Sequence, residues 1–267
     1  MSLNNYGAHY AGLFQKYLEA LDVHYKQIAA LATDEVVQRG VFGDRRAVAG
    51  QAFAVCSHTK QREIESVAEN IIRVMCTLAS EMFAPPGLTV QIERERFKVP
   101  YSNPESFDAR AVWAELLRLY SEGRGESMAY RATARSLTNA FRIDAGDELS
   151  SKCGRVVLEH PIALNAFDKP KTKLTYESRG RVVATLRALH AVALWSDVPD
   201  ANQLLAGADR FDSNRGAVIL RERVPVSGAL HVVTYSNKFE FQFSQEFALS
   251  LQEFIGIYAP VEVDVVS

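Results

Sequence analysis

The chain has 267 residues, of which 48% are hydrophobic and 23% are charged. This composition is that of a globular protein with a full core, and it excludes an intrinsically disordered chain or a fibrous coiled coil. Lysine and arginine together number 30 against 32 aspartates and glutamates, which gives a net charge of −2. That balance excludes a uniformly basic protein that coats nucleic acid, but it leaves room for a local basic patch.

Two long helices are expected at the start of the chain. Apolar residues recur at three- and four-residue steps over 10–39 and over 45–83, with an interruption near Ser57. Such a pair forms an antiparallel αα-hairpin, which the Pro-Pro-Gly run at 85–87 ends. Aromatic residues crowd the first helix and serve either the core or a partner, so a homo-oligomer through these helices is one expectation. They are Tyr6, Tyr10, Phe14, Tyr17 and Tyr25.

The middle of the chain combines one strand with two further helices. Segment 88–99 alternates apolar and charged residues, which predicts a strand at the edge of a sheet. Asp108 is placed to cap a helix that ends near Gly123, and another helix is expected over 126–142.

After residue 146 the pattern becomes mainly that of strands. The expected strands are 155–159, 173–176, 217–224, 229–235, 238–243 and the tail 261–266. Ser236-Asn237 is a candidate tight turn, since Asn tolerates positive φ. Helices are expected over 181–195 and after a cap at Ser244, whereas 196–215 is expected to be rich in loops.

These elements predict an α+β fold. The N-terminal half is helical, with a long αα-hairpin, and the C-terminal half is a mostly antiparallel sheet with two packed helices. We expect a mainly helical region with one edge strand over 1–146 and an α+β region over 147–267; one continuous domain is the alternative.

Motifs with a known chemistry are missing from the sequence. No glycine-rich phosphate loop occurs, and the helical pattern before Ser127 favours a helix N-cap there over a nucleophile elbow. None of the histidines has the i, i+4 spacing of a metal site, so we expect no metal and no cofactor; a metal site assembled from distant His, Asp and Glu side chains is the alternative. His160 ends a strand beside Glu159, and these two with Lys173 are the candidates for a dispersed enzyme site.

One basic stretch stands above the background. Residues 152–187 hold eight basic and three acidic residues, a net charge of +5 in a chain of −2. Arg179 and Arg181 come near a helix start, where the helix dipole disfavours cations, and cations in such a place indicate an anionic partner such as phosphate. A solvated loop and helix face is the alternative. The predicted nucleic-acid or phosphate ligands are Lys169, Lys171, Lys173, Arg179, Arg181 and Arg187.

The C-terminal half resembles a family in the order of three blocks. These are KCGRVVLEHPIAL, RGRVVATLRALHAVAL and ALHVVTYSNKFEFQFSQEFALSLQEFIGIY. Together they are similar to the domain-of-unknown-function family numbered 4942, over residues 108–260 at most. Members of that family occur on plasmids and prophages, some fused to DNA adenine methyltransferases. The resemblance implies that the protein belongs to a mobile genetic element and that its function involves DNA. It assigns no catalytic residue to this chain.

The compartment follows from what the sequence lacks. The cysteines form no Cys-x-x-Cys pair, which argues against a disulfide scaffold or a zinc site. The first ten residues lack the features of a secretory signal, and no apolar stretch approaches the roughly 20 residues that span a bilayer. We therefore expect a soluble, cytoplasmic protein without membrane contact.

Three functions are compatible with these features. The first is non-enzymatic binding of DNA, or of a DNA-acting protein, as an accessory of a phage or plasmid. The second is an enzyme with a dispersed polar site that acts on nucleic acid or on a phosphorylated small molecule. The third is a protein–protein adaptor that uses the helical N-terminal half.

Overall fold

The computed structural model divides into two compact units. The first falls within Met1–Phe83 and Val90–Gly125, and the second within Ala84–Thr89 and Glu126–Ser267. This division falls inside one helix, so it separates two packed groups of residues and does not coincide with a linker. The domain boundary predicted at 146/147 remains a prediction. The structure describes residues 3, 5–33, 47–100, 102–143, 149, 151–152, 154–165, 167, 173–213 and 217–259.

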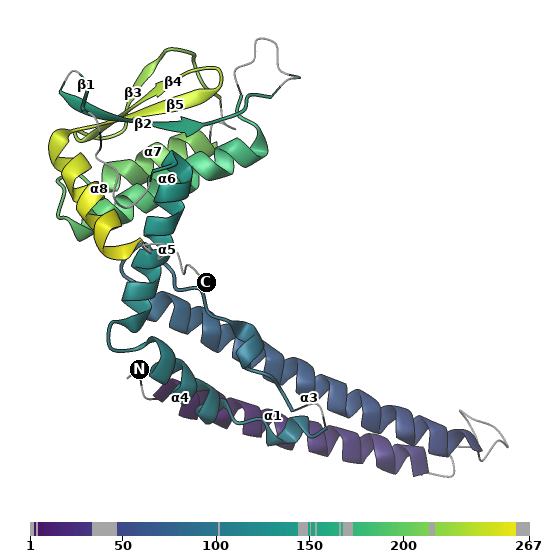
Figure 1. Cartoon of the computed structure of the whole chain (residues 1–267). Coiled ribbons are helices and arrows are strands. Elements are labelled where there is room, and N and C mark those ends of the chain that lie inside the picture. Colours follow the sequence, from purple (N-terminus) through teal and green to yellow (C-terminus); the bar gives the residue numbers. More distant parts are fainter. Residues whose placement is uncertain are drawn as a thin grey trace, which may run out of the picture. The chain divides into compact units, whose positions relative to one another are not determined.

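The first unit is built on the predicted αα-hairpin. Helices α1 (Asn5–Thr33) and α3 (Ala47–Met82) pack along each other, and α4 (Ala109–Tyr120) packs against both (Figure 1). The sequence predicts an interruption of the second helix near Ser57, but α3 is continuous there. Asp108 caps α4 as expected, since its side chain accepts a hydrogen bond from the Arg110 N–H.

The aromatic residues of α1 are largely used inside this unit. Phe14 is buried edge-on against Phe107, with ring centroids 5.2 Å apart. The Tyr6 ring lies 5.3 Å from that of Trp113. The other aromatics predicted for a partner face are half-buried, namely Tyr10, Tyr17 and Tyr25. An oligomer through these helices remains a prediction. Because of this packing, fewer exposed aromatic rings are available to contact a partner.

The edge strand predicted over 88–99 is wrong. Val90 instead bonds to α3, because its N–H donates to the Ser80 carbonyl and its own carbonyl accepts from the Ser80 hydroxyl, at 2.6 Å. The segment then forms a short 3-10 helix, η2 (Arg94–Arg96), and a second one, η3 (Pro104–Ser106), precedes α4. The alternation arises because Val90 and Phe97 are buried while charged residues between them face water.

A close approach of backbones makes Gly125 sensitive to substitution. A Cβ there would lie 2.7 Å from the Phe83 carbonyl oxygen and 2.8 Å from that of Tyr120. Because backbone atoms cannot rotate away, we expect Gly125→Ala to lower the free energy of unfolding by about 1 kcal/mol or more. Gly12→Ala is the control: apart from the backbone of α1 itself, no described atom lies within 4 Å of the position that a Cβ would take, and we expect this change to stabilise α1 by about 0.5–1 kcal/mol. Chemical denaturation measures both, and equal effects would contradict the prediction.

The second unit contains an antiparallel sheet of five strands in its described part. Their order is β1-β2-β5-β4-β3. The strands are β1 (Ser151–Lys152), β2 (Arg155–Pro161), β3 (Arg223–Pro225), β4 (Leu230–Thr234) and β5 (Lys238–Phe243). The central strand β5 pairs Phe241 with Leu158 on one side and with Val232 on the other.

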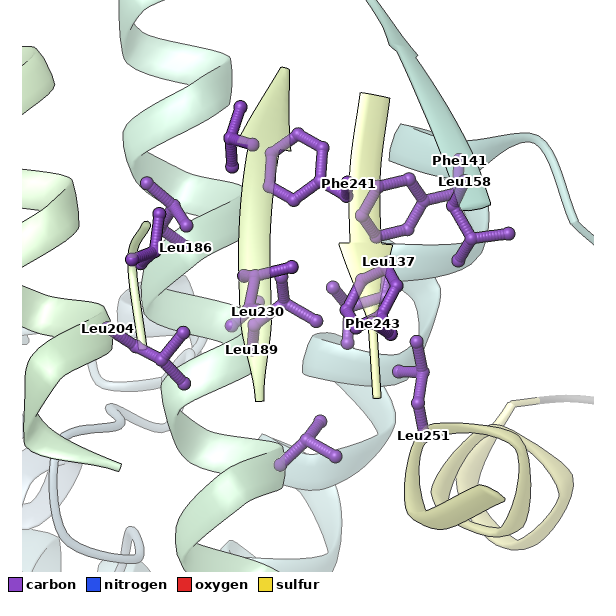
Figure 2. Packing of buried hydrophobic residues seen from close by; sticks show 14 of the residues in the cluster. Leu137, Phe141, Leu158, Leu186, Leu189, Leu204, Leu230, Phe241, Phe243 and Leu251 are labelled. Atoms are coloured by element: carbon purple, nitrogen blue, oxygen red, sulfur yellow. The ribbon is translucent and has the colours of Figure 1, made fainter. Parts of the chain in front are cut away.

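Helices cover one face of this sheet (Figure 1). They are α5 (Arg124–Phe141), α6 (Tyr176–Trp195), α7 (Asn202–Ser213) and α8 (Gln245–Tyr258). Burial alternates along β4 and β5, so every second side chain points into the core. Figure 2 shows Phe241 and Phe243 of β5 packed among Leu137 and Phe141 of α5. The predicted α+β fold with a helical N-terminal half is therefore confirmed.

Several local predictions in this unit need correction. Residues 196–215 include α7, whose apolar residues Leu204, Ala208 and Phe211 recur at helical steps and are buried in the core. The strand predicted over 217–224 is confined to β3, at its end. The strand predicted over 173–176 is reduced to isolated bridges, Leu164 with Leu174 and Lys173 with Ala217. The predicted tail strand lies outside the described residues.

The last hairpin and helix follow the sequence closely. Ser236 and Asn237 join β4 to β5, and Asn237 is not among the residues with positive φ, so the turn is right but its expected cause is wrong. Ser244 caps α8 by accepting from the Phe247 N–H. The cap predicted at Ser127 is wrong, since α5 already begins at Arg124.

Candidate anion-binding site

A cavity of about 370 Å³ lies where α5, β2 and α6 meet in the second unit. Its polar wall comes from all three elements: Ser136, Asn139 and Arg142, which follow one another along α5 and its end; His160 of β2; and Arg181 and Thr185 of α6. Small residues complete the lining, and none of the described residues around it is acidic. The cavity therefore combines two guanidinium groups with neutral hydrogen-bonding groups.

The alternation of β2 carries His160 to this cavity. Val156, Leu158 and His160 are buried on the face that the helices cover, whereas Glu159 is exposed. The predicted pairing of Glu159 and His160 in one enzyme site is therefore not formed. Glu159 instead bonds to Lys238 of β5.

His160 is the unusual member of the site. The residue is 1% exposed, and its Nδ1 atom has no hydrogen-bond partner in the described part of the chain. Its ring centroid lies 6.3 Å from that of Phe141 and 6.0 Å from that of Phe241. Burial lowers the pKa of His160, and the positive charge of Arg181 lowers it further. The backbone carbonyls of His160 and Pro161 oppose this shift, but they do not satisfy Nδ1. The ring is therefore neutral near pH 7.

Arg181 brings a partly exposed charge to the cavity. Its side chain is 49% exposed, and its contacts with described residues are weak: 3.9 Å to the Glu177 carboxylate and 3.5 Å to the Ser178 hydroxyl. An exposed ion pair of this length contributes little to stability. The guanidinium therefore keeps donors that an anion in the cavity could use.

Arg142 reaches the cavity from a strained position at the end of α5. Its φ is +54°, in the left-handed region that glycine and asparagine favour at helix ends. The following N–H, of Ile143, donates to the Thr138 carbonyl at 3.2 Å and closes the helix. Backbone strain of this kind often accompanies a functional site. Glycine would fit this backbone better, but it would bring no charge to the cavity.

The six predicted ligands have different surroundings. Arg181 lines the cavity, whereas Lys169 and Lys171 lie outside the described residues. Lys173 is exposed beside the bridge to Ala217. Arg187 is exposed on α6, outside the cavity lining.

Arg179 faces another part of the unit. Its guanidinium lies 3.7 Å from the Asp212 carboxylate of α7 and 5.4 Å from the centre of the Tyr176 ring. Tyr176 is 85% exposed, and Phe167, on the preceding loop, is 95% exposed. Two exposed aromatic rings thus lie within the basic stretch 152–187, and one of them is in contact with Arg179.

The basic side of α5 is not among the sites predicted from the sequence. Arg131, Arg135 and Arg142 fall on one stripe of the helix and its end, are exposed, and form no ion pair with a described residue. A signal was present, since segment 127–143 contains three arginines and no acidic residue. The stripe lies outside the stretch 152–187, so a count of charge along the chain did not join the two.

Other kinds of site find no support in the described residues. No cluster of three His, Cys, Asp or Glu side chains there could hold a metal ion. No described helix is long and apolar enough to cross a membrane. Cys76 is buried, and burial raises the pKa of its thiol.

Comparison of this chain with protein-family models, with curated proteins and with solved structures finds no match.

Proposed function

We propose that the second unit binds nucleic acid, without catalysis, through a basic surface on α5 and α6. The observation that carries the proposal is the arginine stripe of α5, formed by Arg131, Arg135 and Arg142. Three exposed guanidinium groups without an acidic partner in the described structure are available to phosphate oxygens. Arg181 and Arg187 add two further cations on α6.

Exposed aromatic rings favour a single strand as the ligand. Phe167 and Tyr176, which lie within the basic stretch 152–187, are 95% and 85% exposed. Unpaired bases stack on such rings, at about 1–3 kcal/mol per base, whereas a duplex keeps its bases stacked internally. We therefore expect single-stranded DNA to bind more tightly than a duplex of the same length.

The biological setting belongs to the same proposal. The resemblance of the C-terminal half to plasmid and prophage proteins makes an accessory protein of a mobile element the natural context. A DNA-acting protein that presents acidic groups to the same surface is the second candidate partner. The arginine stripe would serve it too, since carboxylates and phosphates both pair with guanidinium groups.

Charge reversal on α5 tests the proposal. We expect Arg131→Glu/Arg135→Glu to weaken single-stranded DNA binding about 10- to 100-fold at low salt, and to reduce the slope of log K against log salt by about 1.4. Fluorescence anisotropy of labelled single- and double-stranded DNA, at low and near-physiological salt, measures both quantities.

The control is Arg62→Glu/Arg73→Glu, which makes the same charge change at two exposed positions of α3 in the first unit. This variant should keep most of the affinity. Equal losses in the two variants would show a response to net charge alone and would overturn the proposed surface. Absence of binding by the original protein at low salt would overturn nucleic-acid binding itself.

A further inference from the structure

We propose that the cavity between α5, β2 and α6 is a binding site for a phosphomonoester group. This inference goes beyond the nucleic-acid surface, because it rests on His160 and on the cavity, and it holds whether or not the arginine stripe binds a strand.

The first argument is the charge of the wall. Arg142 and Arg181 approach the cavity from two different helices, and no acidic residue lines it in the described part of the chain. Two guanidinium groups without a carboxylate between them form a site for an anion with several oxygens. The Ser136 hydroxyl and the Asn139 amide belong to the same wall and add neutral donors.

The second argument is the orphaned nitrogen of His160. Buried polar atoms nearly always have a hydrogen-bond partner, and one that lacks a partner calls for an explanation. Packing alone does not explain a histidine between Phe141 and Phe241, since an apolar ring would fill that place without a polar atom to bury. An anion in the cavity supplies the reason, because it accepts from the imidazole and favours its protonated form.

The third argument is the size of the cavity and the depth at which His160 lies in it. The cavity, at about 370 Å³, falls at the lower end of the ~300–1,000 Å³ that small-ligand sites occupy. It therefore has room for a phosphate together with part of the molecule that carries it. Because His160 is 1% exposed, only the end of a ligand can reach the ring. A terminal phosphate meets this condition, whereas a phosphodiester inside a strand continues in both directions.

Inorganic phosphate is the first probe, followed with the His160 imidazole signals in a ¹H–¹³C correlation spectrum. We expect phosphate to shift these signals and to raise the pKa of His160, because a bound anion stabilises the imidazolium. Among the described residues, the charged groups that line the cavity with it are Arg142 from the end of α5 and Arg181 from α6, and no described carboxylate lines the cavity beside them. If saturating phosphate leaves the signals and their titration unchanged, the proposal is wrong.

Matched variants locate the site. We expect Arg181→Met to weaken phosphate binding about 10- to 100-fold, as the loss of a charged hydrogen-bond pair does. Arg221→Met is the control, since it removes the same charge from an exposed position of the second unit that belongs neither to the cavity nor to the proposed nucleic-acid surface. Equal weakening by both variants would show diffuse attraction to the surface and would overturn a built site.

Two ligand pairs identify the source of the phosphate. Adenosine monophosphate against adenosine tests a phosphorylated small molecule, and a 5′-phosphorylated oligonucleotide against its 5′-hydroxyl form tests a nucleic-acid end. In at least one pair the phosphorylated member should bind about tenfold more tightly, and no preference in either pair would overturn the proposal. Circular single-stranded DNA has no terminal phosphate, so its binding tests the arginine stripe alone and separates the failure of one proposal from that of the other.

Discussion

Replacing Phe241 with alanine is expected to lower the free energy of unfolding of the second unit by about 3–5 kcal/mol. Phe241 is fully buried at the middle of the central strand, with its ring centroid 5.2 Å from that of Phe141 and 6.4 Å from that of Phe243 (Figure 2). Its strand pairs on both sides, so neighbouring elements cannot close a cavity there by moving inward.

Chemical denaturation followed by circular dichroism measures this loss, and hydrogen exchange in β5 peptides assigns it to the second unit. Gln242→Ala is the matched control, since the next residue points to the other face of the same strand and is only half-buried. Its effect should stay below about 1 kcal/mol. If the two variants were equally destabilised, Phe241 would not be the central contact of this core.

Replacing His160 with phenylalanine should raise the free energy of unfolding instead of lowering it. The unpaired Nδ1 atom is buried at a cost of about 1–3 kcal/mol, which an apolar ring avoids. The aromatic contacts with Phe141 and Phe241 are retained, and the added volume can extend into the cavity. We therefore expect His160→Phe to raise the free energy of unfolding by about 1–3 kcal/mol at pH 7 while abolishing phosphate binding.

The stability gained by His160→Phe relative to the original protein should increase as the pH falls. The pKa of His160 in the folded protein lies below its ordinary value of 6.5, so below about pH 6.5 the unfolded chain binds the proton more readily. The original protein therefore loses stability as pH falls from about 6.5 toward the folded pKa, and the variant lacks this contribution. Denaturation curves at pH 7 and pH 5 measure the difference.

His190 provides the control for this prediction. It is also buried, but its Nε2 atom lies 3.3 Å from the Asn202 amide oxygen. His190→Phe removes a satisfied hydrogen bond, so it should not stabilise the protein at either pH. Stabilisation by both substitutions, or by neither, would contradict the special role assigned to the unpaired nitrogen of His160.

The sequence predicts an element well where a single local rule decides it. The three- and four-residue spacing around Phe14 and Leu21 identifies α1, and the alternation of Phe239, Phe241 and Phe243 identifies β5. The rule fails where burial against a helix imitates a strand, as at Val90. It also fails for α7. Pro199 and Gly207 favour a loop there, whereas the short apolar stripe of the same segment forms a helix.

The candidate site was only partly within reach of the sequence. The sequence predicts His160 as an enzyme residue and Arg181 as a phosphate ligand, and no local pattern shows that the two line one cavity. The period of a strand does show that Glu159 and His160 point to opposite faces, so their predicted partnership could have been rejected. The position of Arg142 at the cavity could not be predicted from the sequence. It depends on a left-handed backbone conformation at a helix end, where glycine is the usual residue.

The pairing of β2 with β5 has a consequence for synthesis. Leu158 lies opposite Phe241, so the ribosome releases β2 roughly 80 residues, or about 4–16 s, before its partner is complete. The hairpin of the first unit can fold in that interval from contacts between nearby residues, but the edge of β2 that pairs with β5 stays unpaired until β5 emerges. The nascent chain is therefore most open to aggregation, or to capture by a chaperone, between the emergence of β2 and that of β5.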